Sequence, residues 1–108
     1  MTTSATNLVN MTANEIVGLL KKREVTPAEL LDALRERISE VDNKVNALPT
    51  LCWERAYKDA DKMSNLSLDE RGILAGLPVA IKDLNPVSGV RSTWGSPIYR
   101  DFVPTRSD

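Results

Sequence analysis

The residue with the clearest capacity for chemistry is Lys82, which lies near the end of an apolar run. The run extends from Leu77 to Leu84, with Gly76 before it and Asn85-Pro86 after it. Both alternating faces are apolar until the last positions, a pattern typical of a strand covered on both sides. A lysine at the carboxyl end of such a strand is partly desolvated, which favours the neutral amine that can act as a base.

Spacing alone also allows a simpler interpretation of this segment. Lys82-Asp83 could simply be where the strand ends and the chain becomes exposed to solvent, because most lysines at strand ends are solvated. Asp83 could hold Lys82 or a neighbouring amide in place, or it could cap a turn. Ser92, Thr93 and Ser96 lie in a glycine-containing loop, where they are turn formers unless one of them pairs with Lys82 as a Ser–Lys dyad.

The composition excludes several kinds of site. The chain has no histidine and one cysteine, Cys52. A Ser-His-Asp or Cys-His enzyme, a structural zinc site and an internal disulfide therefore cannot be built from these residues. Any catalysis must use lysine, carboxylate or hydroxyl groups, and we expect neither a metal nor a cofactor.

Charge and hydropathy limit the partners and the location of the protein. Its 108 residues include 14 basic and 15 acidic side chains, a net charge of −1, so no basic excess predicts binding to nucleic acid or to a membrane surface. No apolar stretch is long enough for a transmembrane helix, and Met1–Asn10 lacks the apolar core of a signal peptide. A single cysteine fits a reducing compartment, so we expect a cytoplasmic protein.

Three helices are predicted before the apolar run. Residues 1–11 are predicted to form a polar, flexible arm. Thr12 to Glu15 and Thr26 to Glu29 each form a capping box, the second with proline at the first helical position. The helices are expected at residues 13–23, 27–41 or slightly beyond, and 53–63, where apolar residues recur at helical spacing. The stripe of the second helix consists of Leu30, Leu34, Ile38, Val41 and Val45.

The order of these elements predicts an incomplete α/β fold. After the helices come one good strand, 77–84, and two weak candidates, 46–52 and 90–94. As an isolated piece the chain would be α+β, because one strong strand lacks the partners that a stable sheet requires. Ser107-Asp108 resembles the N-cap of a following helix. We therefore expect a piece of a larger fold, with an exposed edge and apolar surface that favour self-association.

The amino-acid sequence of the apolar segment and its surroundings resembles that of one enzyme family. Gly76-Leu77-Pro78-Val79-Ala80-Ile81-Lys82-Asp83 is similar to the N-terminal part of amidase-signature enzymes, as are Val87-Ser88-Gly89-Val90 and Ser92-Thr93-Trp94-Gly95-Ser96. Upstream, Thr26-Pro27-Ala28-Glu29-Leu30-Leu31 and Val45-Asn46-Ala47 occur in a similar order. The resemblance covers the chain after the arm, so residues 12–108 would be the N-terminal segment of an amidase-signature domain.

This resemblance implies a mechanism and a limit. In that family the matching lysine is the base of a Ser–cis-Ser–Lys triad that hydrolyses small-molecule amides through an acyl-enzyme, with backbone N–H groups holding the oxyanion. Lys82 is the only position that can be carried over. The family's glycine- and serine-rich signature, which supplies both serines, has no counterpart among the five dispersed glycines. We therefore expect a chain truncated before the signature and inactive alone; the alternative is a non-catalytic helical interaction or self-associating module.

Overall fold

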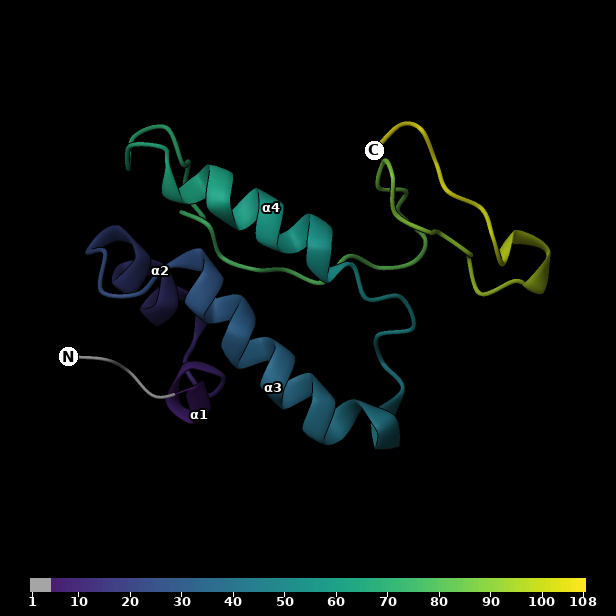
Figure 1. The fold of residues 1–108 in the computed structure, drawn as a ribbon, viewed down its shortest axis with the longest axis horizontal. Coiled ribbons are helices and arrows are strands. Elements are labelled where there is room, and N and C mark those ends of the chain that lie inside the picture. The colour runs from purple at the N-terminus through teal and green to yellow at the C-terminus, as the bar shows by residue number, and fades with distance from the viewer. Residues whose placement is uncertain (1–4) are drawn as a thin grey trace. The chain divides into compact units, whose positions relative to one another are not determined.

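The computed structural model describes residues 5–108 (Figure 1). Four α-helices and one 3₁₀ helix follow one another within this range. The chain divides into two compact units, Met1–Pro78 and Val79–Asp108, which we call the first and second units. The elements are α1 (Ala5–Leu8), α2 (Ala13–Lys21), α3 (Pro27–Val45), α4 (Trp53–Ser64) and η1 (Pro97–Tyr99).

Both predicted capping boxes start a helix. The Thr12 hydroxyl accepts a hydrogen bond from the Glu15 N–H at 3.2 Å and donates one to the Glu15 carboxylate at 3.1 Å. The Thr26 hydroxyl accepts from the Glu29 N–H at 3.1 Å, and Pro27 occupies the first turn of α3. These bonds satisfy N–H groups that a helix start leaves without an intrahelical acceptor.

The ends of α2 and α3 are set by residues in the left-handed region. Arg23 has φ 57°, and the N–H groups of Arg23 and Glu24 donate to the carbonyls of Leu20 and Leu19 at 3.1 and 2.9 Å. This pair of bonds is a Schellman motif, so α2 ends at Lys21, two residues before its predicted end. Helix α3 continues four residues past Val41 and ends where Asn46 adopts φ 55°.

The apolar core of the first unit forms around α3, which packs against α1 and α4. Leu20 of α2 is completely buried, with 0% of its surface exposed. Leu8 of α1 is also buried, although it lies in the predicted arm; the flexibility of residues 1–11 stays a prediction, since 1–4 lie outside the described residues. The core consists of Leu8, Leu20, Val25, Leu30, Ala33 and Ala75.

Polar and aromatic side chains join α3 to α4. The Tyr57 hydroxyl donates to an Asp32 carboxylate oxygen at 2.5 Å. The Arg35 guanidinium carbon lies 5.6 Å from the centre of the Trp53 ring, within the range of a cation–π contact. Each pair joins one residue of α3 to one residue of α4. Both are contacts between α3 and α4 inside the first unit.

The predicted strands are not formed in residues 5–108. The segment 77–84 is irregular, as are 46–52 and 90–94, and the one β-bridge is isolated, between Val87 and Val90. Val79, Ile81 and Leu84 are 63%, 56% and 50% exposed, so the expected burial of both faces is wrong for this chain. A strand requires a neighbour that is hydrogen-bonded along its length, and in residues 5–108 no such backbone ladder forms along the apolar run. The described chain is helical, and an α/β class is not confirmed.

The second unit is held by turns and by an aromatic cluster. The rings of Trp94, Tyr99 and Phe102 lie 5.1 to 6.0 Å apart between centres. The N–H groups of Gly89 and Ser92 donate to the carbonyls of Pro104 and Phe102 at 2.9 and 3.1 Å, which brings the two halves of the unit together. Regular secondary structure is therefore limited here to η1.

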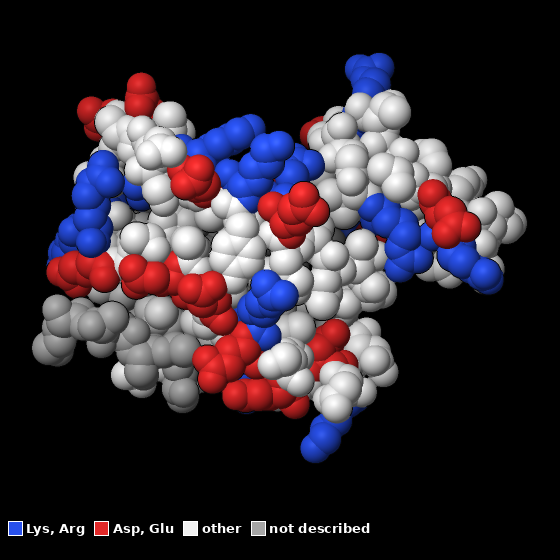
Figure 2. All heavy atoms as spheres, viewed as in Figure 1, with Lys and Arg blue, Asp and Glu red and all other residues white. Residues whose placement is uncertain are grey.

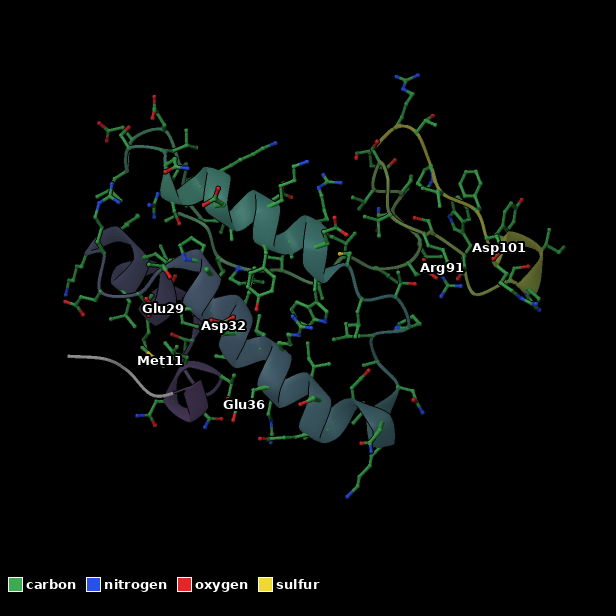
Figure 3. All side chains as sticks on the ribbon, in the orientation of Figure 1. Met11, Glu29, Asp32, Glu36, Arg91 and Asp101 are labelled. Atoms are coloured by element: carbon green, nitrogen blue, oxygen red, sulfur yellow. The ribbon has the colours of Figure 1, made fainter. Side chains whose placement is uncertain are left out.

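Acidic side chains are frequent along α3, which also carries basic residues. Glu29, Asp32 and Glu36 follow one another along α3, as their labels in Figure 3 show. Figure 2 shows acidic side chains in a band over α3 and basic side chains beside α4, where Lys58 and Lys62 are exposed. No helix in residues 5–108 is long and apolar enough to cross a membrane.

Candidate functional site

Lys82 lies in the second unit on an exposed turn. Its carbonyl accepts a hydrogen bond from the Asn85 N–H at 2.9 Å, which closes the turn directly after the apolar run. The expected desolvation of the side chain is not seen, because the run that carries it is unpaired. The role of Lys82 as a base stays a prediction, and its neighbours show how its backbone is held.

Asp83 binds Thr93 through both oxygens of its carboxylate. The Thr93 N–H donates to Asp83 Oδ1 at 2.8 Å, and the Thr93 hydroxyl donates to Asp83 Oδ2. The same hydroxyl oxygen accepts from the Gly95 N–H at 3.2 Å. The three groups form a hydrogen-bonded chain that runs from the turn at Gly95 to the carboxylate next to Lys82.

Trp94 adds two hydrogen bonds to the same segment. Its backbone N–H donates to the Asp83 carbonyl at 3.2 Å, and its indole N–H donates to the Leu84 carbonyl at 3.1 Å. Trp94 adopts φ 51°, an uncommon value for a residue other than glycine, and Gly95 follows with φ 70°. This turn places both N–H groups of Trp94 toward the residues after Lys82.

Hydrogen bonding favours the ionised form of Asp83. The Thr93 hydroxyl and the Thr93 N–H hold the pKa of the Asp83 carboxyl below its ordinary value of 3.8, with a smaller contribution from the charge of Arg91 and partial opposition from burial. Arg91 itself donates to the Arg100 carbonyl at 2.9 Å; Figure 3 shows it near Asp101. The site is thus a carboxylate with its hydrogen bonds in place at neutral pH.

The other hydroxyl candidates serve local structure. Ser92 is buried, and its hydroxyl lies 3.4 Å from the Val90 carbonyl. The Ser96 hydroxyl accepts from the Ile98 N–H at 3.3 Å and caps η1. These bonds agree with the interpretation of Ser92 and Ser96 as turn formers, whereas Thr93 also binds Asp83 ten positions away.

The sequence singled out both Asp83 and Thr93 as candidates but did not predict that they are partners. The two residues are separated by ten positions, so no local turn rule joins them. The one sequence feature that indicates such a pairing is the Thr93-Trp94-Gly95 turn, in which a hydroxyl and successive N–H groups can point at one acceptor. Such a turn gives no indication of which carboxylate it will meet.

Two other features of the described residues do not form a site. No group of three metal-ligating side chains comes together in residues 5–108. A small hollow in the first unit has only apolar residues in its wall and so lacks the polar groups that orient a ligand. It is lined by Leu8, Val9, Met11, Ile16, Leu30, Ala33, Leu34, Leu77 and Pro78.

Comparison with known proteins places the chain in one family. The Amidase family matches residues 29–108, which include Lys82, Asp83 and Thr93. The chain therefore belongs to the Amidase family. The family match confirms the resemblance seen in the residues around Lys82, and no solved structure matches the chain.

The similar proteins are much longer than this chain. The chain is 36% identical over 98 residues to a glutamyl-tRNA(Gln) amidotransferase subunit from Shouchella clausii, covering 91% of the chain and 20% of that protein. It is 40% identical over 97 residues to the protein of the same name from Halothermothrix orenii, covering 90% of the chain and 19% of that protein. The chain thus spans about a fifth of the length of the curated relatives it matches.

Proposed function

We propose that these residues are the N-terminal segment of an amidase domain that cleaves carboxylic amide C–N bonds, with Lys82 as the base of a Ser–cis-Ser–Lys triad. The observation that supports this most directly is the family match over residues 29–108. The matched residues include Lys82, which lies near the end of Gly76–Asp83, the most specific part of the resemblance. The serines and the oxyanion-binding N–H groups would come from sequence outside residues 1–108. Residues 12–108 are then one part of a larger domain.

The chemistry proposed for Lys82 is proton transfer. Its neutral amine accepts a proton through the intermediate serine, while the nucleophilic serine attacks the amide carbon and forms a tetrahedral intermediate. The proton then passes to the leaving amine, and the C–N bond breaks to leave the acyl-enzyme. Water attacks the acyl-enzyme, gives up its proton by the same route, and releases the acid and the free serine. The substrate would be a small-molecule amide, and no cofactor takes part. The relatives are named as amidotransferase subunits, so transfer of the released nitrogen to an acceptor is a variant of the same step.

The exposed position of Lys82 accords with a segment that further sequence covers. Val79, Ile81 and Leu84 are apolar and at least half exposed. Pairing of this run with a neighbouring strand would bury these side chains and desolvate the lysine, as an α/β fold requires. We propose that the α/β arrangement, and with it catalysis, needs that neighbour; the 108-residue chain alone is then inactive.

The experiment compares amide hydrolysis by the purified 108-residue chain and by the complete gene product, using simple aliphatic and aromatic amides. We expect turnover only in the complete product, with loss of at least about 10³-fold in Lys82→Ala. Lys58→Ala, which removes another exposed lysine from α4, is the matched control and should leave the rate unchanged. Full activity of Lys82→Ala would overturn the proposal.

A second candidate function is a self-associating module, favoured by the same exposed run. Pairing of 77–84 between two copies would bury apolar surface without any second domain. Light scattering across a concentration series tests it. Val79→Asp should shift the equilibrium to monomer, while Val45→Asp, at an equally exposed residue of α3, should not. A monomer at high concentration in the unsubstituted chain removes this candidate.

A further inference from the structure

Four hydrogen bonds tie the two residues after Lys82 to a turn ten positions further along the chain. Two go from the Thr93 N–H and hydroxyl to the Asp83 carboxylate. The other two go from the Trp94 backbone and indole N–H groups to the carbonyls of Asp83 and Leu84. Within the second unit, the end of the apolar run next to Lys82 is therefore held by Thr93 and Trp94, although no strand ladder forms along the run.

We propose that Asp83 is a positioning residue, which anchors the backbone of Lys82 to Thr93-Trp94 and thereby fixes the direction of the lysine amine. This inference rests on the proposed function, because it assigns the anchor a purpose in proton transfer by Lys82. Asp83 itself need not touch the substrate. Its effect passes through the single peptide bond that joins it to Lys82.

A carboxylate is the group that this arrangement requires. Its two oxygens are acceptors only, and each meets one donor of Thr93. An asparagine would present an NH₂ group to one of those two donors. The Thr93 hydroxyl is further constrained because its oxygen already accepts from the Gly95 N–H, so turning it round would break that bond. The chain from Gly95 through Thr93 to Asp83 thus has one favourable direction.

An anchor matters because a lysine side chain is long and rotates freely. Proton transfer requires the amine within hydrogen-bond distance of the serine that it serves, and a misplacement of 1 Å can cost about 10²-fold in rate. The exposed run before Lys82 supplies little restraint of its own. The four bonds after it are the restraint that the structure shows.

The experiment uses Asp83→Asn and Thr93→Val in the complete gene product, with Asp101→Asn as the control acid from the same unit. Hydrogen–deuterium exchange at the amides of Thr93 and Trp94 reports the anchor directly, whether or not the enzyme turns over. The pH profiles of kcat and kcat/KM report the base. Thr93→Ser, which keeps the hydroxyl, should retain the unsubstituted behaviour and shows that the fold tolerates a change there.

We expect Asp83→Asn to speed hydrogen–deuterium exchange at the amides of Thr93 and Trp94. It should also lower kcat by about 10²-fold with a smaller change in KM. In the pH profile of kcat, it should move the limb that Lys82→Ala abolishes. Thr93→Val should give a weaker form of the same changes, and Asp101→Asn none. Slow exchange retained at Thr93 in Asp83→Asn overturns the anchor.

Faster exchange with an unmoved pH limb and unchanged kcat shows that the anchor is structural only, which overturns the positioning role while the proposed function stands. Activity retained in Lys82→Ala instead overturns the proposed function, and the positioning role with it. The two failures are therefore distinguished by the Lys82 variant.

Discussion

Gly76 lies directly against Pro27: a Cβ atom added to Gly76 would stand 2.7 Å from the Pro27 Cγ. Pro27 is the first residue of α3, and Gly76 opens the motif that ends in Lys82 and Asp83. Gly76 also has φ 103°, a value that side-chain-bearing residues rarely adopt. The glycine is therefore required twice, for its backbone conformation and for the close approach of the proline ring.

Gly76→Ala should lower the free energy of unfolding by about 3 kcal/mol, since backbone strain and overpacking add. Gly72→Ala is the matched control: it has φ 78° but nothing within 4 Å of its added Cβ, so it should cost only about 1 kcal/mol. Denaturant titration followed by circular dichroism measures both. Pro27→Ala in the Gly76→Ala background should recover part of the loss; equal costs for the two glycine variants would rule out the contact.

Arg23→Gly should stabilise the first unit. Arg23 ends α2 with φ 57°, a conformation that glycine adopts without the steric cost of a Cβ. After subtraction of the larger entropy that glycine loses on folding, a gain of about 0.5 kcal/mol remains. Lys22→Gly, one residue earlier in right-handed helical conformation, should instead destabilise. A thermal melt of the two variants compares them, and a lower melting temperature for Arg23→Gly would contradict the prediction.

Tyr57→Phe should weaken the contact between α3 and α4. It removes the hydroxyl that donates to Asp32, and because the pair is exposed we expect a loss of only about 0.5 kcal/mol. The hydrogen bond to Asp32, followed by burial and the Asp32 charge, raises the pKa of Tyr57 above 10.0 against the opposing effect of Arg35. Its contribution is therefore complete below pH 10 and is lost as pH rises through the raised pKa.

The measurement for this pair is urea unfolding at neutral and at strongly alkaline pH. The difference between the unsubstituted chain and Tyr57→Phe should disappear at the alkaline end. Tyr99→Phe, in the second unit, is the control for removal of a tyrosine hydroxyl. A difference that stays constant with pH would contradict the assigned hydrogen bond.

Acid should release the anchor at Asp83. Hydrogen bonds from Thr93 hold the pKa of the Asp83 carboxyl below 3.8, so the folded state favours the ionised form. The stabilisation is complete above pH 3.8 and is lost as pH falls through the lowered pKa. Arg91 is the neighbouring charge that contributes.

Amide exchange at Thr93, corrected for the intrinsic effect of pH, checks this dependence. Protection should stay level at neutral and mildly acidic pH and then decline on further acidification. Asp83→Asn should remove the pH dependence as well as the protection. A decline centred near neutral pH would assign the effect to a different group.

The helices could be predicted from the sequence because their signals are local. Thr12 and Thr26 cap helices through contacts three residues away, and Leu30 of the predicted stripe is buried, although Val45 at the end of the stripe is exposed. The ends were less predictable, since nothing in the residue type shows that Arg23 would adopt a left-handed conformation. Leu8 was missed because Leu8, Val9 and Met11 form too short a cluster in a polar stretch to show helical periodicity.

The segment around Lys82 could be predicted only as a pattern. Alternation from Leu77 to Leu84 favours a strand, but strand formation depends on a partner whose residues lie elsewhere. The Asp83–Thr93 pair likewise depends on how a distant turn folds back. Arg71 is a third case: it is buried, with one donor to the Ser64 carbonyl at 3.4 Å and its Nε without a hydrogen-bond partner, which no local rule predicts.

The two tryptophans lie in different compact units, Trp53 at the start of α4 and Trp94 in the turn that holds Asp83. Each unit thus contains one tryptophan of its own. Trp53→Phe and Trp94→Phe would each leave a single tryptophan, so that its emission, excited apart from that of tyrosine, reports one unit. Coincident fluorescence transitions would show that residues 1–108 unfold as one cooperative body, and separated transitions that the Lys82 segment melts independently of the helices.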